Sequence, residues 1–184
     1  MSASDLTTLA NARQWLGLTS TNDDALLSRL ITAASNYIQS WLNRSFASRE
    51  YSETRDGAGG AKLPFTNYPV TAVASVTIDG QSIPLASGSQ APGYMFSATM
   101  LYLNGYSFAR GRQNVNIAYT AGFAATPPEI EQACLELMAV RYKERDRIGQ
   151  VSKSIGGETI TFSQKDFPDP VRTILNNYKK DVPL

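Results

Sequence analysis

The side chains that most often perform catalysis are scarce in this sequence of 184 residues. It has no histidine, which excludes Ser–His and Cys–His nucleophile pairs and His-ligated metal sites. Its one cysteine, Cys134, falls on the apolar side of a predicted helix, which is typical of a small core residue. The glycine-rich residues 57–60 lack the following lysine and helix start of a phosphate-binding loop, so they indicate a plain loop.

Paired carboxylates are the other side chains whose spacing could support catalysis. Asp23 and Asp24 are adjacent, and Asp166 lies near Asp169. A metal-dependent nuclease or hydrolase would need such acids to converge from several elements of the fold. Acids at helix starts commonly cap the first turn, and these pairs stand at predicted helix starts. The sequence therefore favours capping, and we assign no catalytic residue, no metal ligand and no cofactor.

A run of charged residues ends the helix predicted around Cys134. The run alternates cations with acids and consists of Arg141, Lys143, Arg145 and Arg147 with Glu144 and Asp146. A site-specific DNA-binding protein would show a clear basic face, which the interleaved acids weaken. Cations near a helix C-terminus complement the helix dipole, which explains the run without a ligand. The formal net charge is +1, so no global field attracts nucleic acid or an anionic membrane.

The helix that carries this run, over residues 126–149, is the most clearly specified element of the chain. We expect Thr126 to cap it, Glu129 to complete a capping box and Pro127 to take the first helical position. Apolar residues recur at steps of three and four on one face, namely Ile130, Ala133, Leu137 and Val140. Further apolar residues widen that face, so we expect burial on more than one side, with Gly149 ending the helix.

Three further helices are predicted. Residues 4–16 form a short first helix that Gly17 can end. Residues 23–43 form a long second helix whose apolar stripe consists of Leu27, Leu30, Ala34, Ile38 and Trp41. This wide stripe fits burial between subunits or in a thick intrachain core, and both alternatives stay open. The last helix is capped by Asp169 and opens with Pro170, and its apolar face consists of Val171, Ile174, Leu175 and Tyr178.

Between the second and third helices the hydrophobic pattern changes to the alternation typical of strands. Residues 49–120 contain short strand-like runs separated by turn signals such as Asp79-Gly80 and Asn104-Gly105. A second hairpin signal covers residues 150–163. We therefore predict an α+β fold: a small core of about four helices (1–48 and 121–184), an inserted β-rich subdomain (49–120) and a short hairpin before the C-terminal helix.

The order of these segments resembles that of a known protein family. The most specific stretches are Leu63-Pro64 with Tyr68-Pro69-Val70, the strand end at residues 119–123 and the arginine-rich helix end. None of them is a catalytic motif. Over nearly the whole chain, the pattern resembles the head–tail connector (adaptor, or head completion) proteins of long-tailed double-stranded DNA phages, in the longer branch with a β insertion.

The resemblance implies a structural virion protein rather than an enzyme. Members of this family form a ring, usually of twelve subunits, beneath the portal protein. The ring extends the DNA channel, is passed by DNA without sequence specificity and offers a platform for a stopper or tail-completion protein. The expected location is the head–tail junction, after synthesis in the host cytoplasm. The alternative function is a metal-dependent DNA-processing enzyme or a DNA-binding packaging protein.

Two segments are candidates for contacts with other subunits. The hairpin needs a surface to cover its apolar residues, which a neighbouring subunit or a place at the channel would supply; the candidates are Val151, Ile155, Gly156, Gly157, Ile160 and Phe162. The resemblance implies that the C-terminal helix docks on the portal through Val171, Ile174, Leu175 and Tyr178. Packing of this helix on its own subunit is the alternative. No apolar run approaches the ~20 residues of a membrane span, and no membrane partner is expected.

Overall fold

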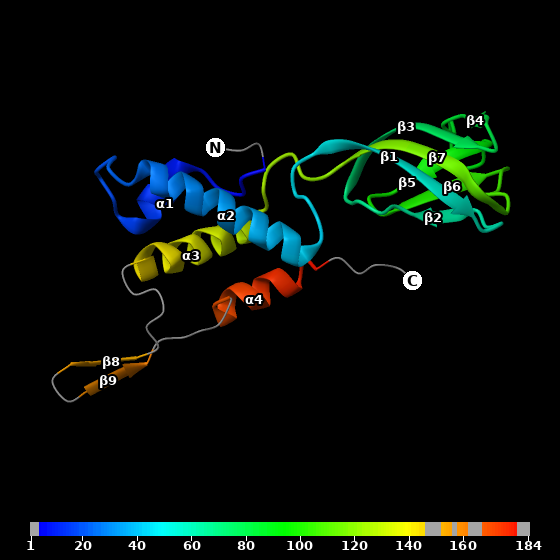
Figure 1. Ribbon diagram of the computed structural model, residues 1–184. Helices are drawn as coiled ribbons and strands as arrows, with labels where there is room; N and C mark the ends of the chain where they lie inside the picture. Colours follow the sequence, from blue (N-terminus) through cyan, green and yellow to red (C-terminus); the bar gives the residue numbers. More distant parts are fainter. Residues whose placement is uncertain (1–3, 146–151, 156–157, 162–166, 180–184) are drawn as a thin grey trace. The chain divides into compact units, whose positions relative to one another are not determined.

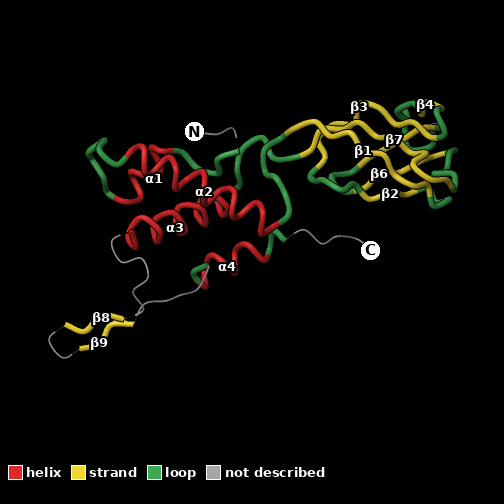
Figure 2. The backbone as a smooth tube through the Cα atoms, viewed as in Figure 1, coloured by secondary structure: helices red, strands yellow, loops and turns green. Residues whose placement is uncertain are grey.

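The computed structural model describes residues 4–145, 152–155, 158–161 and 167–179 (Figure 1). The described residues divide into a helical unit, within Met1–Phe46 and Thr126–Lys180, and a β unit, Ala47–Ala125. Figure 2 shows helices in red in the first unit and strands in yellow in the second. The predicted α+β class, with a β-rich middle region between the second and third helices, is confirmed.

The first helix, α1 (Leu9–Leu16), has a defined cap at each end. The hydroxyl of Thr8 accepts a hydrogen bond from the backbone N–H of Asn11 at 3.2 Å. Gly17 takes the left-handed conformation at φ 67°, and the N–H of Leu18 donates to the carbonyl of Arg13 at 2.9 Å. The glycine stop predicted from the sequence is confirmed, because this arrangement satisfies the carbonyls of the last turn.

The second helix, α2 (Asp24–Leu42), buries its apolar stripe inside the chain's own helical unit. The buried residues are Leu27, Ile31, Ala34, Ser35, Ile38 and Leu42. Leu30 and Trp41, which we expected in the stripe, are only half-buried, because the stripe is centred on the Ile31 side of the helix. The spacing of four, three, four and four residues through Leu27, Ile31, Ala34, Ile38 and Leu42 keeps one face turned to the core.

The third helix, α3 (Pro128–Glu144), begins later than the sequence suggested. Pro127 is the N-cap residue at φ −56° and ψ 135°, and no side chain caps this end. The expected capping box of Thr126 and Glu129 is therefore wrong. The reason is Pro128: a residue before proline is pushed out of the helical region, so Pro127 cannot be the first helical residue. The Pro127 carbonyl instead accepts from the N–H groups of Ile130 and Glu131, both at 3.0 Å.

The α3 helix is buried on more than one side, as expected. Its buried residues are Ile130, Ala133, Cys134, Leu135, Leu137, Met138, Ala139 and Tyr142. Val140, which we expected on the buried face, is half-buried. Gly149, the expected end of the helix, lies outside the described residues.

The last helix, α4 (Asp169–Asn176), packs on its own helical unit through Val171 and Leu175, both 0% exposed. Just before it, the ring of Phe167 stacks on Tyr37 of α2 at 4.8 Å between centroids and meets Trp41 edge-on at 5.6 Å. Asp169 is the first helical residue and does not cap the helix, so that expectation is wrong. Pro168 takes the N-cap position instead, in an extended conformation at φ −55° and ψ 144°.

Two antiparallel sheets form the β unit. One sheet has the order β1-β7-β3-β4 and the other β2-β6-β5. Their strands are β1 (Arg49–Gly57), β2 (Lys62–Pro64), β3 (Val70–Ile78), β4 (Gln81–Ile83), β5 (Gly93–Phe96), β6 (Met100–Asn104) and β7 (Gly111–Ala121). Residues from both sheets share one buried cluster, so the β unit has its own hydrophobic core.

The sequence pattern predicted two details of the β unit correctly. Val115, Ile117 and Tyr119 alternate along β7 and are at most 2% exposed, so they form the inward face of that strand. Asp79 and Gly80 connect β3 to β4 with positive φ values of 51° and 79°. Two positive φ values are what a two-residue hairpin turn of this kind requires.

The predicted second hairpin is present as β8 (Ser152–Ile155) and β9 (Glu158–Thr161). The two strands are antiparallel, with Ile155 opposite Glu158 and Lys153 opposite Ile160. Val151, Gly156, Gly157 and Phe162 lie outside the described residues.

We expect the substitution Leu175→Ala to destabilise the helical unit by roughly 2–5 kcal/mol, because it removes a fully buried side chain and leaves a cavity. Urea unfolding followed by circular dichroism at 222 nm measures the loss. The matched control is Arg172→Ala on the exposed side of α4, which we expect to change stability by less than about 0.5 kcal/mol. Equal effects of the two substitutions would show that α4 is not part of the core.

Candidate assembly interface

The segment that precedes α1 is fastened to α2 by polar contacts. The N–H of Leu6 donates to the hydroxyl of Ser35 at 2.9 Å, and Leu6 itself is 3% exposed. The side-chain amide of Gln39 donates to the carbonyl of Ser4 at 3.0 Å. These contacts hold residues 4–8 in place and thereby position α1 beside the other helices.

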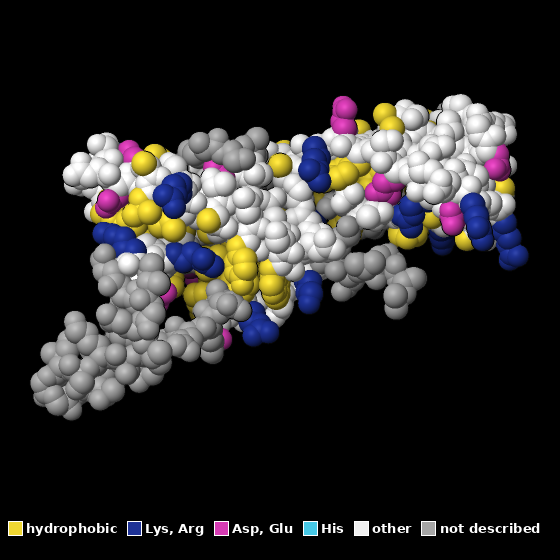
Figure 3. All heavy atoms as spheres, viewed as in Figure 1, with side chains coloured by type: hydrophobic (Ala, Val, Ile, Leu, Met, Phe, Trp, Pro, Cys, Tyr) yellow, Lys and Arg dark blue, Asp and Glu magenta, His cyan; other side chains and the backbone are white. Residues whose placement is uncertain are grey.

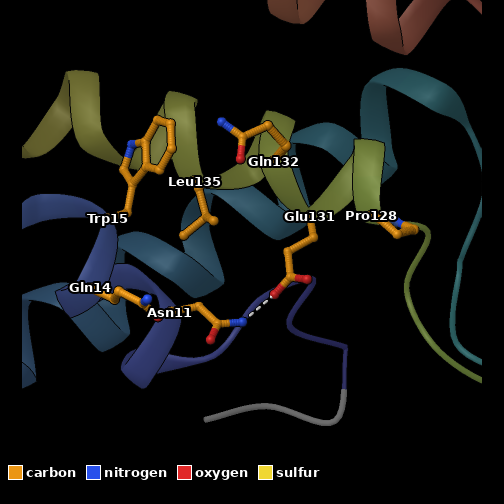
Figure 4. Close-up of a pocket in the computed structure, with 7 residues that line it drawn as sticks. All are labelled: Asn11, Gln14, Trp15, Pro128, Glu131, Gln132 and Leu135. Atoms are coloured by element: carbon orange, nitrogen blue, oxygen red, sulfur yellow. Dashed lines mark hydrogen bonds between the residues drawn. The ribbon is translucent and has the colours of Figure 1, made fainter.

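Glu131 of α3 completes this attachment. Its Oε1 atom accepts from the hydroxyl of Thr7 at 2.9 Å and from the side-chain amide of Asn11 at 2.6 Å (Figure 4). The second carboxylate oxygen, Oε2, has no hydrogen-bond or ion-pair partner among the described residues. Glu131 therefore joins α1 to α3 and still presents a free acceptor.

A groove lies where α1 meets α3 (Figure 4). This α1–α3 groove has a volume of about 430 Å³ and is lined by Asn11, Gln14, Trp15, Pro128, Glu131, Gln132 and Leu135. Trp15 is 49% exposed, which is unusual for so large an apolar side chain. The lining offers an aromatic face, an aliphatic side chain and one carboxylate, but no nucleophile. Such a lining suits recognition of another surface rather than catalysis.

Charges on α3 are segregated along the helix. Its first half carries the acids Glu129, Glu131 and Glu136. Its last turn carries the cations Arg141 and Lys143 beside the acid Glu144, and Arg145 is the C-cap residue. The guanidinium of Arg141 lies over the ring of Tyr37 at 5.4 Å, and that of Arg145 lies over Tyr142 at 4.0 Å. Asp146 and Arg147, the last two residues of the charged run, lie outside the described residues. One helix therefore presents an acidic first half and a last turn in which the two cations outnumber the one acid, Glu144.

The acids considered for catalysis serve other contacts. The phenol of Tyr142 donates to the Asp23 carboxylate, and this hydrogen bond raises the pKa of Tyr142. Asp23 occupies the N-cap position of α2 but makes no side-chain cap there, because its carboxylate is taken by Tyr142. Asp24 pairs with Arg13 at 3.3 Å. Within the described ranges, no group of three or more acids or cysteines could hold a metal ion, and Asp166 lies outside them.

The residues of the C-terminal helix predicted to dock on a partner divide into two kinds. Val171 and Leu175 are fully buried within the helical unit, whereas Ile174 and Tyr178 are half-buried. The Tyr178 phenol donates to Glu129 Oε2 at 2.9 Å, and its carbonyl accepts from Arg44 at 3.3 Å. A patch of hydrophobic side chains, coloured yellow, is visible over α3 and α4 on the face shown in Figure 3.

In the β unit a half-buried polar cluster surrounds the carboxylate of Glu53. Tyr119 donates its phenol proton to Glu53, and the N–H of Asn67 donates to the Tyr119 oxygen at 3.1 Å. Thr66 donates to Glu53 at 2.9 Å, and Arg55 donates to Thr66, also at 2.9 Å. Burial, followed by the hydrogen bond to Glu53, raises the pKa of Tyr119 far above its usual range. The cluster ties the segment between β2 and β3 to the larger sheet, which is a structural task.

A match to a protein-family model decides the family. The model of the head completion protein family matches residues 5–181. The chain belongs to the head completion protein family. The resemblance seen in the sequence is confirmed, and with it a structural role as a head–tail connector in the virion, at the head–tail junction. No curated protein matches the chain significantly.

Solved structures share the fold of this head completion protein. A chain from the neck of an empty gene transfer agent (GTA) particle, computed with C6 symmetry, is 19% identical, with a TM-score of 0.61 over 100% of this chain and 95% of that one. A chain from the neck of the native GTA particle, computed with C12 symmetry, is 17% identical, with a TM-score of 0.60 over 99% and 92%. A third, from the virion of the native particle, is 19% identical, with a TM-score of 0.59 over 97% and 92%.

Neither the groove nor the Glu131 contacts could be found from the sequence pattern. The partners Asn11 and Glu131 are separated by 120 residues. Trp15 gave the one available signal, because a large aromatic residue stands in the last turn of a short helix, two residues before the glycine that ends it. A further finding concerns membranes: none of the helices in the described ranges is long and apolar enough to span one.

Cys134 is predicted to be unreactive in the folded protein. Its side chain is fully buried, with Sγ 3.5 Å from the Ser35 hydroxyl, and burial raises the pKa of the thiol to about 11. A raised pKa keeps the thiol protonated at pH 8, and the thiol form is a poor nucleophile. Ellman's reagent at pH 8 should label the native protein at least about a hundredfold more slowly than the protein in 6 M guanidinium chloride. Equal rates in the two conditions would contradict the buried position.

Proposed function

We propose that this head completion protein assembles as a closed ring, with twelve copies as the expected number, beneath the portal protein of a phage or phage-like particle. The observation that carries the proposal is the family match over residues 5–181. The similar neck structures computed with C6 and C12 symmetry support a ring arrangement for this fold. A head-to-tail interface repeated around an axis closes into such a ring.

The ring extends the DNA channel and supports a stopper or tail-completion protein on its far side. DNA passes through it without sequence-specific contacts, in keeping with a net charge of only +1. The protein acts without catalysis. The acids that a metal-dependent DNA-processing enzyme would need are engaged by Tyr142 and Arg13, which supports this part of the proposal.

The C-terminal helix is the proposed contact with the portal. Val171 and Leu175 are buried and hold α4 on its own helical unit, so they fix its orientation. Ile174 and Tyr178 are half-buried and lie on the side that remains accessible, next to exposed polar residues of the same helix. We assign the direct portal contact to Ile174 and Tyr178, with Val171 and Leu175 as the residues that position them.

The hairpin of β8 and β9 is the proposed contact with a neighbouring subunit or with the channel. A two-stranded hairpin is marginally stable in water by itself, so a second surface is needed to stabilise it. The candidate residues remain Val151, Ile155, Ile160 and Phe162, with Gly156 and Gly157 at the turn.

The direct test of the proposed function is the mass of the complex with the portal of the same particle. We expect mass photometry to show the portal mass increased by about twelve times the 20.0 kDa chain, whether or not the ring forms alone. The portal by itself and this protein by itself are the controls. A bound mass equal to one or two chains, or no binding at any concentration, would contradict the ring.

Deletion of residues 154–158 tests the hairpin. We expect the helical unit and the β unit to fold as before and the ring yield on the portal to fall, because the hairpin loses its turn and its strand pairing. The control is replacement of Gly156-Gly157 by Asn-Gly, a pair that also forms a tight two-residue turn and should preserve assembly. An unchanged ring yield after the deletion would assign the hairpin to another task.

A further inference from the structure

The α1–α3 groove has the chemistry to bind a cation that is carried on an apolar stem. Trp15, which is 49% exposed, and Glu131, whose Oε2 atom has no partner among the described residues, both line this groove (Figure 4). An ammonium or guanidinium group is attracted both by an aromatic face and by a carboxylate. The methylene stem of lysine or arginine would pack on the apolar lining of the groove, which includes Leu135.

The same chain presents a matching surface at the other end of α3. Arg141 and Lys143 on its last turn and Arg145 at its C-cap are exposed, whereas the acid Glu144 between Lys143 and Arg145 is half-buried. Arg141 and Arg145 lie over aromatic rings of their own unit, whereas Lys143 makes no ion pair or ring contact among the described residues. Each copy therefore carries one acidic groove and one basic helix end with a cation available for pairing.

A single copy cannot join these two surfaces. Glu131 and Lys143 are twelve residues apart on one helix, which is about 18 Å at a rise of 1.5 Å per residue. An ion pair requires a distance of about 4 Å between the charged atoms, so the complementary surfaces can meet only between two copies. Two different surfaces that meet between copies make a head-to-tail contact, which is the kind that closes into a ring.

We propose that the α1–α3 groove of one copy receives the basic end of α3 of the next copy, with Lys143 lying over Trp15 and against Glu131 of its neighbour. The inference rests on the proposed ring and identifies its subunit interface. Attraction between opposite charges sets the order of the subunits, because groove-to-groove contact would bring Glu131 carboxylates together.

Disulfide cross-linking tests the proposal on the ring bound to its portal. Gln132 lines the groove, and Gln132→Cys with Lys143→Cys in a Cys134→Ala background places one thiol on each proposed surface. The two positions are eleven residues apart on α3, about 16 Å, and a disulfide needs Cα atoms within about 7 Å, so no bridge can form within one copy. We expect oxidation to give a ladder of covalent oligomers, and we expect each single-cysteine variant to remain monomeric under denaturing conditions.

The possible results separate the inference from the proposed function. A ring that forms on the portal but gives no ladder from the double variant would overturn this interface and leave the ring standing. Dimers from Gln132→Cys alone would also overturn it, because they would show that grooves face each other. If the unmodified chain forms no ring, the proposed function itself fails.

Charge reversal gives an independent measurement that needs no cross-link. We expect Lys143→Glu to weaken the affinity between copies about tenfold. Adding Gln132→Lys, which places a cation in the groove, should restore that affinity in the double variant. Arg172→Glu, an exposed reversal on α4, should leave the affinity between copies unchanged. Equal losses from Lys143→Glu and Arg172→Glu, or no rescue by Gln132→Lys, would overturn the proposed pairing.

Discussion

The packing of α2 against α3 is the interaction on which the helical unit depends. Ile31, Ile38 and Leu42 of α2 are at most 1% exposed, as are Ile130, Leu137 and Met138 of α3. The other parts of the unit attach to this pair: residues 4–8 through Ser35 and Glu131, and α4 through Val171 and Leu175. Close packing of two long helices thus positions both the α1–α3 groove and the C-terminal helix, the two surfaces assigned to assembly.

The β unit is inserted between these two helices without separating them. Its first and last long strands, β1 and β7, pair side by side, with Arg49 opposite Ala121. Ala47 and Phe123 also form a bridge. A Cβ atom at Gly122 would lie 2.5 Å from the Ala47 carbonyl oxygen, so only glycine permits this close approach. The two ends of the inserted segment therefore lie side by side. This is why α2 and α3 can pack against each other although the β unit separates them in the sequence.

The sequence predicted the features that local chemistry determines. Gly17 ends α1, and Val115 and Ile117 alternate into the core, because a left-handed stop and a strand period need only neighbouring residues. The predicted helix cap at Thr126 was wrong, because Pro127 precedes a second proline and therefore cannot be helical, so that the helix begins only at Pro128. The contacts of Glu131 and the accessible ring of Trp15 depend on which helix packs beside which, and no local pattern records that.

The central claim is that this head completion protein forms the ring between head and tail. Cryo-electron microscopy of the neck of the particle, reconstructed without imposed symmetry, measures this directly. The expected result is a closed ring of this chain in direct contact with the portal, with the basic end of each α3 in the groove of the adjacent copy. A neck in which the chain is absent, or present as isolated copies with no contact between them, would contradict the claim.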